Sequence, residues 1–197
     1  MQTAYTITHK GMLYAISSEL KDMTGNLLLQ VLKHSFYAPV NFLQLCEYLN
    51  GDKQRAFKQV CEMLESEYID IDDQALEKLS EQQTLEDITA QSDEFILSDF
   101  NGLVVYRSGF DSEDAAHLAS MACDLIKVSR RTDIMVGDVD TLQPISIETR
   151  WKQNTVITYL LCLGACKCLL TCRSQAFWQQ PAVLPMISYL CSRYANG

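Results

Sequence analysis

The sequence predicts an α+β fold in which an antiparallel sheet with flanking helices is preceded by a small helical domain. Three observations support this prediction. Two strand-like runs, residues 94–99 and 103–108, flank an Asn-Gly pair, the strongest short-range signal of a β-hairpin. Three further strand patterns follow one another between residues 143 and 172. Amphipathic helical patterns lie before, between and after these strands.

Composition and charge exclude several classes of protein. The 197 residues are 48% hydrophobic, with 8 glycines and 4 prolines, so the chain can bury a substantial core. The formal charge is −9, and no segment has the basic excess of a general polyanion binder, so nucleic acid is not the expected partner. The sequence shows neither a secretion signal nor an apolar run long enough to span a bilayer. We therefore expect a cytoplasmic protein without membrane insertion.

Residues 1–75 are expected to form a helical domain that resembles a winged helix-turn-helix. A helical pattern runs from Ser17 through Leu32 and is interrupted by Thr24-Gly25-Asn26, where one helix can end and another begin. Two further helices are predicted at residues 40–49 and 53–65. Asn50-Gly51-Asp52 supplies the stop of the second helix and the cap of the third. Residues 67–71 then alternate like a short strand.

The third predicted helix would enter the major groove if this domain bound DNA, with Lys53, Arg55 and Lys58 available to phosphates and bases. Four carboxylates in or beside the same helix oppose that interpretation, because they repel phosphates. These are Asp52, Glu62, Glu65 and Glu67. We favour a structural or protein-docking role for the domain and keep a DNA-binding transcriptional regulator as the alternative.

Residues 76–93 have a net charge of about −4 and few apolar anchors, a pattern that indicates an acidic linker helix. The remaining residues, 94–197, are expected to form the α/β domain. Within it, Asn101-Gly102 predicts a two-residue type I′ turn, since both residues tolerate positive φ. Asp111 or Ser112 then caps a helix, and the small apolar residues in its first half allow close approach of another element.

The later strands differ in how they are buried. Residues 143–151 alternate between apolar and polar side chains, as in a strand with one wet face. Residues 155–162 are apolar on both faces, and residues 166–172 alternate again. A helix that is clear from Pro185 to Tyr194 completes the pattern.

The order hairpin, helix, three-stranded meander, helix resembles the roadblock family, which includes dynein roadblock light chains and regulators of small Ras-like GTPases. The resemblance rests on FILSDFNGLVVYRSG, on the alanine-rich helix from Ala115 to Val128 and on strands ending in CKCLLTC, and it covers about half of the chain. It implies a five-stranded antiparallel sheet between helices, a homodimer, and a regulator or scaffold for a partner GTPase or signalling complex. It implies no catalytic residue.

In that strand order, residues 143–151 leave one edge of the sheet open. We expect this strand to pair with its copy in a second subunit, while the small-residue helices pack across the same two-fold axis. The predicted dimer interface comprises Ala115, Leu118, Ala119, Ala122, Ile145, Ile147 and Thr149. The alternative is that the N-terminal domain covers this edge.

The residues that could carry chemistry favour a protein without catalysis. Cys162, Cys166, Cys168 and Cys172 lack the paired spacing of a structural zinc site, and the last three fit one face of a strand, so we expect buried packing. None of the three histidines has a nucleophile or ligand set at a defining spacing, and no glycine-rich phosphate loop occurs. We therefore predict no enzyme activity, no metal and no cofactor.

Overall fold

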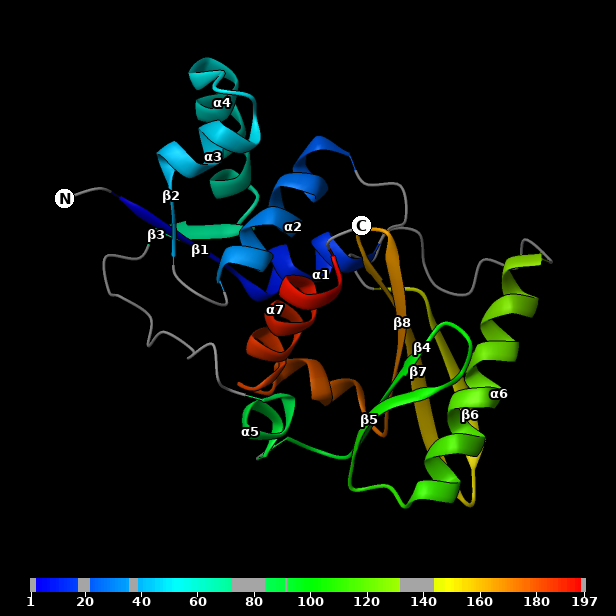
Figure 1. The fold of residues 1–197 in the computed structure, drawn as a ribbon. Helices are drawn as coiled ribbons and strands as arrows, with labels where there is room; N and C mark the ends of the chain where they lie inside the picture. Colours follow the sequence, from blue (N-terminus) through cyan, green and yellow to red (C-terminus); the bar gives the residue numbers. More distant parts are fainter. Residues whose placement is uncertain are drawn as a thin grey trace.

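The computed structural model describes residues 3–17, 22–35, 39–71, 84–90, 92–131 and 144–195. It contains a three-stranded sheet in the N-terminal part and a five-stranded antiparallel sheet in the C-terminal half, each accompanied by helices (Figure 1). The fold is therefore α+β with a helical N-terminal region, as the sequence predicts.

The N-terminal part consists of seven elements among the described residues. They are β1 (Ala4–Ile7), α1 (His9–Ser17), α2 (Met23–Ser35), β2 (Val40–Asn41), α3 (Phe42–Tyr48), α4 (Lys53–Glu65) and β3 (Ile69–Ile71). Strand β1 is the centre of the small sheet and pairs antiparallel with both β2 and β3. The first described strand therefore lies in the middle of this sheet.

Local side chains explain where these helices start. Asn41 and Gln44 form a reciprocal capping box at α3, and the Asp52 carboxylate accepts from the Arg55 N–H at α4. The Asp22 carboxylate likewise accepts from the Gly25 N–H at the start of α2, which begins at Met23 and runs through Thr24-Gly25-Asn26 without a break. Of the helical pattern predicted from Ser17 onward, residues 18–21 lie outside the described residues, and α2 carries the rest as one helix that the Thr24-Gly25-Asn26 segment does not interrupt.

The C-terminal part contains the elements of the large sheet and its helices. They are α5 (Leu85–Thr89), β4 (Phe95–Asp99), β5 (Val104–Ser108), α6 (Ser112–Arg131), β6 (Ser146–Trp151), β7 (Asn154–Leu163), β8 (Cys166–Cys172), the 3-10 helix η1 (Gln175–Gln179) and α7 (Val183–Tyr194). The strand order is β5-β4-β8-β7-β6, and every neighbouring pair is antiparallel. The predicted order of hairpin, helix, meander and helix is confirmed. Of the predicted linker helix, residues 76–83 lie outside the described residues.

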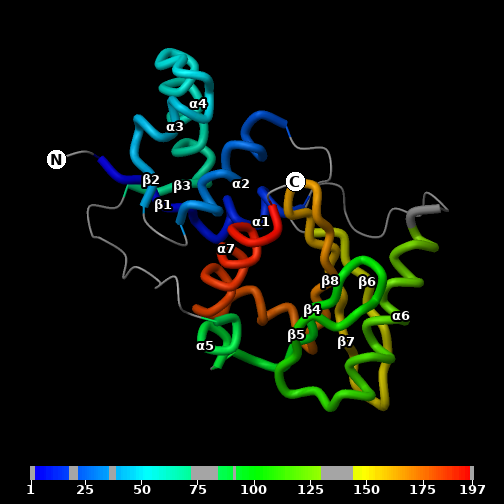
Figure 2. The backbone as a smooth tube through the Cα atoms, viewed as in Figure 1, coloured from blue at the N-terminus to red at the C-terminus, as the bar shows by residue number. Residues whose placement is uncertain are grey.

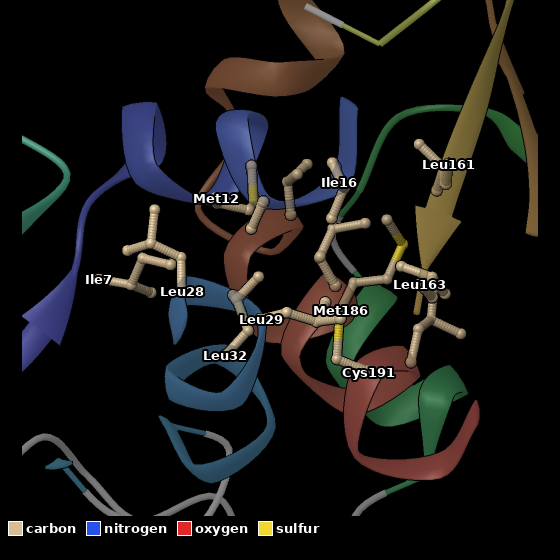
Figure 3. Close-up of a cluster of buried hydrophobic side chains, with 14 of the residues drawn as sticks. Ile7, Met12, Ile16, Leu28, Leu29, Leu32, Leu161, Leu163, Met186 and Cys191 are labelled. Carbon is tan, nitrogen blue, oxygen red and sulfur yellow. The ribbon is translucent and has the colours of Figure 1, made fainter. Parts of the chain in front are cut away.

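Helices cover the two faces of the large sheet unequally. Among the described residues, α6 is the helix along one face, and α7 packs with α1 and α2 on the other, while α3 and α4 project away from the sheet (Figures 1 and 2). On the α7 side, Met12 and Ile16 of α1 belong to one cluster of buried side chains with Leu161 and Leu163 of β7 and Met186 of α7 (Figure 3). One hydrophobic cluster therefore joins the N-terminal helices to the large sheet.

The hairpin turns differ from the sequence-based expectation. In the β4–β5 loop only Gly102 has a positive φ, of 84°, and the Asp99 carboxylate accepts from the N–H groups of Asn101 and Leu103. This is a three-residue loop, so the predicted type I′ turn is wrong here, because the Asp99 side chain organises a longer turn. A two-residue primed turn instead joins β6 to β7, where Lys152 and Gln153 have φ values of 43° and 72°.

Candidate interaction site at the β6 edge

Strand β6 lies at one edge of the large sheet and is regular along its whole length. It pairs with β7 in unbroken register from Ser146 opposite Tyr159 to Trp151 opposite Asn154. The Leu160 N–H donates to the Ile145 carbonyl over 2.8 Å, which fixes the direction of the backbone groups. Because these groups alternate along an antiparallel strand, those of Ile147, Thr149 and Trp151 face β7. The N–H and C=O groups of Ser146, Glu148 and Arg150 face the open edge.

The opposite edge of the sheet, β5, is irregular. Leu97 pairs with Tyr106 and Ser98 pairs with Val104, so Val105 is an extra residue that bulges from the ladder. Bulges interrupt the row of backbone groups that another strand would need. The two edges are therefore unequal, and β6 is the one suited to pairing with a further strand.

The side chains of β6 divide between the two faces of the sheet. Ile147 packs with the cluster beneath α6, and Trp151 contacts the His117 ring with centroids 6.3 Å apart. Glu148 and Arg150 point to the other face and are exposed. The structure records no ion pair of either residue with any other described residue.

A charged contact fixes the end of α6 next to the β6–β7 turn. Lys152 Nζ lies 2.6 Å and 2.7 Å from the two carboxylate oxygens of Asp114. This hydrogen bond from the ammonium lowers the pKa of Asp114 and raises that of Lys152. The contact holds the primed turn against the first turn of the helix, so β6 and α6 are positioned together.

The helix residues of the predicted dimer interface are buried inside the chain. The exposed fractions are 0% for Ala115, 1% for Leu118, 0% for Ala119 and 3% for Ala122. They pack against residues of β4, β7 and β8, including Ile96, Val156 and Leu160. A role for α6 in dimer contacts stays a prediction. The helix offers a different set to solvent, which includes Ala116, Ser120, Asp124 and Val128.

The strand residues of that prediction lie at the edge itself. Ile145 is 40% exposed, and Ile147 and Thr149 are half-buried on the α6 side. The Thr149 hydroxyl has no hydrogen-bond partner among the described residues. Sequence reasoning placed Glu148 and Arg150 on the wet face but missed their part in the site. Their opposite charges, two residues apart on an edge strand, were the available signal.

Helix α4 presents the residues proposed for DNA contact. Lys53, Arg55 and Lys58 are all exposed, but Lys58 Nζ lies 3.6 Å from the Glu62 carboxylate and Arg55 Nε donates to the sulfur of Met23. Phe57, between them, is 65% exposed. The exposed half of this helix is thus a mixed surface of basic, acidic and aromatic groups.

The cysteines of β8 behave as buried packing groups. Burial raises the pKa of Cys168 to about 11 and that of Cys172 to about 12, so both are thiols at neutral pH. Both belong to the main hydrophobic cluster, whereas Cys162 lies under α6 on the other face. Within the described ranges, no group of three histidine, cysteine or acidic side chains is placed to hold a metal ion.

A small open cavity of about 270 Å³ lies at the start of β4 and the end of β8. Its charged groups pair with one another or with neighbours: Arg173 with Glu94, and Asp93 with Gln180. No ligand chemistry follows from it. Among the helices that the structure describes, none is long and apolar enough to cross a membrane.

Comparison with known proteins finds a likeness only among solved structures. No family model matches the chain, and no curated protein matches it. The matching solved structures include a crystal structure of a Roadblock/LC7 domain from Streptomyces avermitilis, which is 20% identical, with 53% of this chain and 85% of that one covered. The TM-score is 0.32, a weak likeness at the level of the fold. The description of the fold therefore rests on the strand order and the helices above.

Proposed function

We propose that this chain is a non-enzymatic regulator or scaffold that forms a homodimer through β6 and binds a small Ras-like GTPase or another signalling complex. The observation that carries the proposal is the contrast between the regular edge of β6 and the bulged edge of β5. A regular edge presents unpaired N–H and C=O groups, which a second copy of the strand satisfies. The roadblock-like order of elements supports the choice of partner.

Replacement of Glu148 with proline tests the dimer. The Glu148 N–H faces the open edge, so Glu148→Pro removes a donor to the second copy while the β6–β7 ladder keeps its hydrogen bonds. We expect a dimer for the wild-type protein and a folded monomer for this variant by light scattering coupled to gel filtration.

Ile147→Pro is the matched control. The Ile147 N–H faces β7, so this substitution breaks the chain's own ladder and lowers the free energy of unfolding. A Glu148→Pro variant that stays dimeric with unchanged affinity would contradict strand-mediated dimerisation.

The GTPase partner needs a direct test. Purified Ras-like GTPases from the same organism, loaded with GDP or with a non-hydrolysable GTP analogue, are titrated against the untagged chain by calorimetry. We expect binding that depends on the nucleotide state, because the switch segments of such GTPases change order with the γ-phosphate. Equal absence of binding in both states, across all the GTPases, would contradict this part of the proposal.

DNA binding is the second candidate, because Lys53, Arg55 and Lys58 are all exposed on the first half of α4. Binding to duplex DNA at about 50 mM salt, with a steep loss on adding salt, would support it. Lack of binding under those conditions would remove this candidate and leave the N-terminal part as a structural or protein-docking unit.

A further inference from the structure

We propose that β6 pairs with β6 of a second copy in one register only, with Thr149 on the two-fold axis and Glu148 of each copy opposite Arg150 of the other. This inference rests on the proposed homodimer and specifies its geometry. It follows from the direction of the backbone groups and the order of charges along a six-residue strand.

The backbone limits the possible registers. Ser146, Glu148 and Arg150 direct their N–H and C=O groups outward, so these even-numbered residues must form the hydrogen-bonded pairs of the new ladder. Even positions therefore pair with even positions. A register shifted by one residue would place an even-numbered residue opposite an odd-numbered one, whose N–H and C=O groups already bond to β7. It would also place side chains from opposite faces of the sheet next to each other.

The charges of Glu148 and Arg150 distinguish the remaining registers, which differ in the residue that lies on the two-fold axis. An axis at Glu148 places two carboxylates opposite each other, and an axis at Arg150 places two guanidinium groups opposite each other, both of which are unfavourable. An axis at Ile147 leaves these charges unpaired and brings Pro144, which has no N–H, into the ladder. An axis at Thr149 gives two Glu148–Arg150 pairs by symmetry.

The uncharged side chains agree with the same register. With Thr149 on the axis, Ile147 of each copy lies opposite Trp151 of the other, and such aromatic and β-branched pairs stabilise antiparallel strands. The two Thr149 side chains meet at the axis. Within the sheet, Thr158 and Thr171 make the same kind of cross-strand contact, with their hydroxyl oxygens 2.8 Å apart.

Charge exchange tests the register. Glu148→Arg and Arg150→Glu each convert both cross-strand pairs into like-charge pairs, so each should weaken the homodimer by about tenfold or more at low salt. The double variant restores two attractive pairs and should regain wild-type affinity. An equimolar mixture of the two single variants should form heterodimers, detected by native mass spectrometry, because both of its charge pairs are attractive.

The outcomes separate this inference from the proposed homodimer. A wild-type dimer whose affinity is unchanged in both single variants would overturn the register while dimerisation stands. Weakening in the single variants without recovery in the double variant or in the mixture would overturn it as well. A wild-type chain that is monomeric at all accessible concentrations would overturn dimerisation itself. Circular dichroism of every variant confirms that the chain is folded.

Disulfide cross-linking tests the register by a second method, whose readout is the distance between opposite residues and not the attraction between charges. Directly opposite residues in a non-hydrogen-bonded pair have Cα atoms about 4.5 Å apart, within the range that a disulfide spans. Thr149→Cys should therefore cross-link the dimer under mild oxidation, as seen on non-reducing gels against the wild-type background. Glu148→Cys and Arg150→Cys are the controls, since a cross-link dominated by either would place the axis at that residue and overturn the proposal.

Discussion

Gly102 shows how one residue can serve both a turn and a helix contact. Its φ of 84° lies in the left-handed region, and a Cβ atom built on it would lie 3.1 Å from Ser120 Cα and 3.2 Å from the Ala119 carbonyl oxygen of α6. The β4–β5 loop therefore crosses the helix with backbone close to backbone. Only glycine satisfies both requirements without strain.

Gly102→Ala and Gly51→Ala separate these two effects. Gly51 also has a positive φ, of 80°, but nothing lies within 4 Å of its added Cβ. We expect Gly51→Ala to lower the free energy of unfolding by about 1 kcal/mol through backbone strain. Gly102→Ala should cost about 1–3 kcal/mol more, because α6 must also shift. Equal losses in urea denaturation would contradict the close approach of the loop to α6.

At the scale of an element, the β6–β7 hairpin holds the candidate site in register. Its two-residue turn has positive φ at Lys152 and Gln153, neither of which is glycine. The ion pair between Lys152 and Asp114 accounts for keeping a lysine at the first position. No described residue makes a comparable contact with Gln153, so strain remains at the second position.

Gln153→Gly should therefore stabilise the chain. Relief of the positive φ outweighs the added freedom of the unfolded chain, and we expect a gain of up to about 1 kcal/mol in the free energy of unfolding. Gln54→Gly, the same change at an exposed position inside α4, should cost about 1 kcal/mol. A loss at both positions in thermal denaturation would show that the turn is not strained.

For the molecule as a whole, the main feature is a hydrophobic core shared by the N-terminal helices and the large sheet. Leu28 of α2 is fully buried and belongs to the same cluster as Leu161 of β7 and Met186 of α7. Residues distant in sequence therefore depend on one another for burial. The division into domains at residues 75 and 94 stays a prediction, and the shared core gives it a direct test.

Leu28→Ala should destabilise the C-terminal half although the residue lies in the N-terminal part. Both tryptophans, Trp151 and Trp178, are in the C-terminal half, so their fluorescence reports its unfolding. We expect a single transition, shifted by about 2–5 kcal/mol in urea. Phe57→Ala, which truncates an exposed side chain of α4, should change the midpoint little. A tryptophan-monitored transition that Leu28→Ala leaves unchanged would favour independently folding domains.

Local patterns in the sequence were sufficient for much of the C-terminal half. Short-range chemistry decides strand alternation, the cap at Asp111 and the position of Pro185 in the first turn of α7, so the order of elements and the α+β class followed from sequence. The same patterns predicted that residues 143–151 form an edge strand, and β6 does lie at the edge. The local pattern gave the wrong turn type for the β4–β5 loop, because the Asp99 carboxylate stabilises a three-residue loop in place of the two-residue turn.

The tertiary structure alone decided which surfaces remain free. Periodicity marks Ala115, Leu118, Ala119 and Ala122 as one apolar face, but only the packed structure shows that this face covers the chain's own sheet. Likewise, the helical pattern of α2 could not reveal that its apolar side shares a core with α7. Burial depends on contacts between segments distant along the chain, and those contacts leave no periodic signal in either segment by itself.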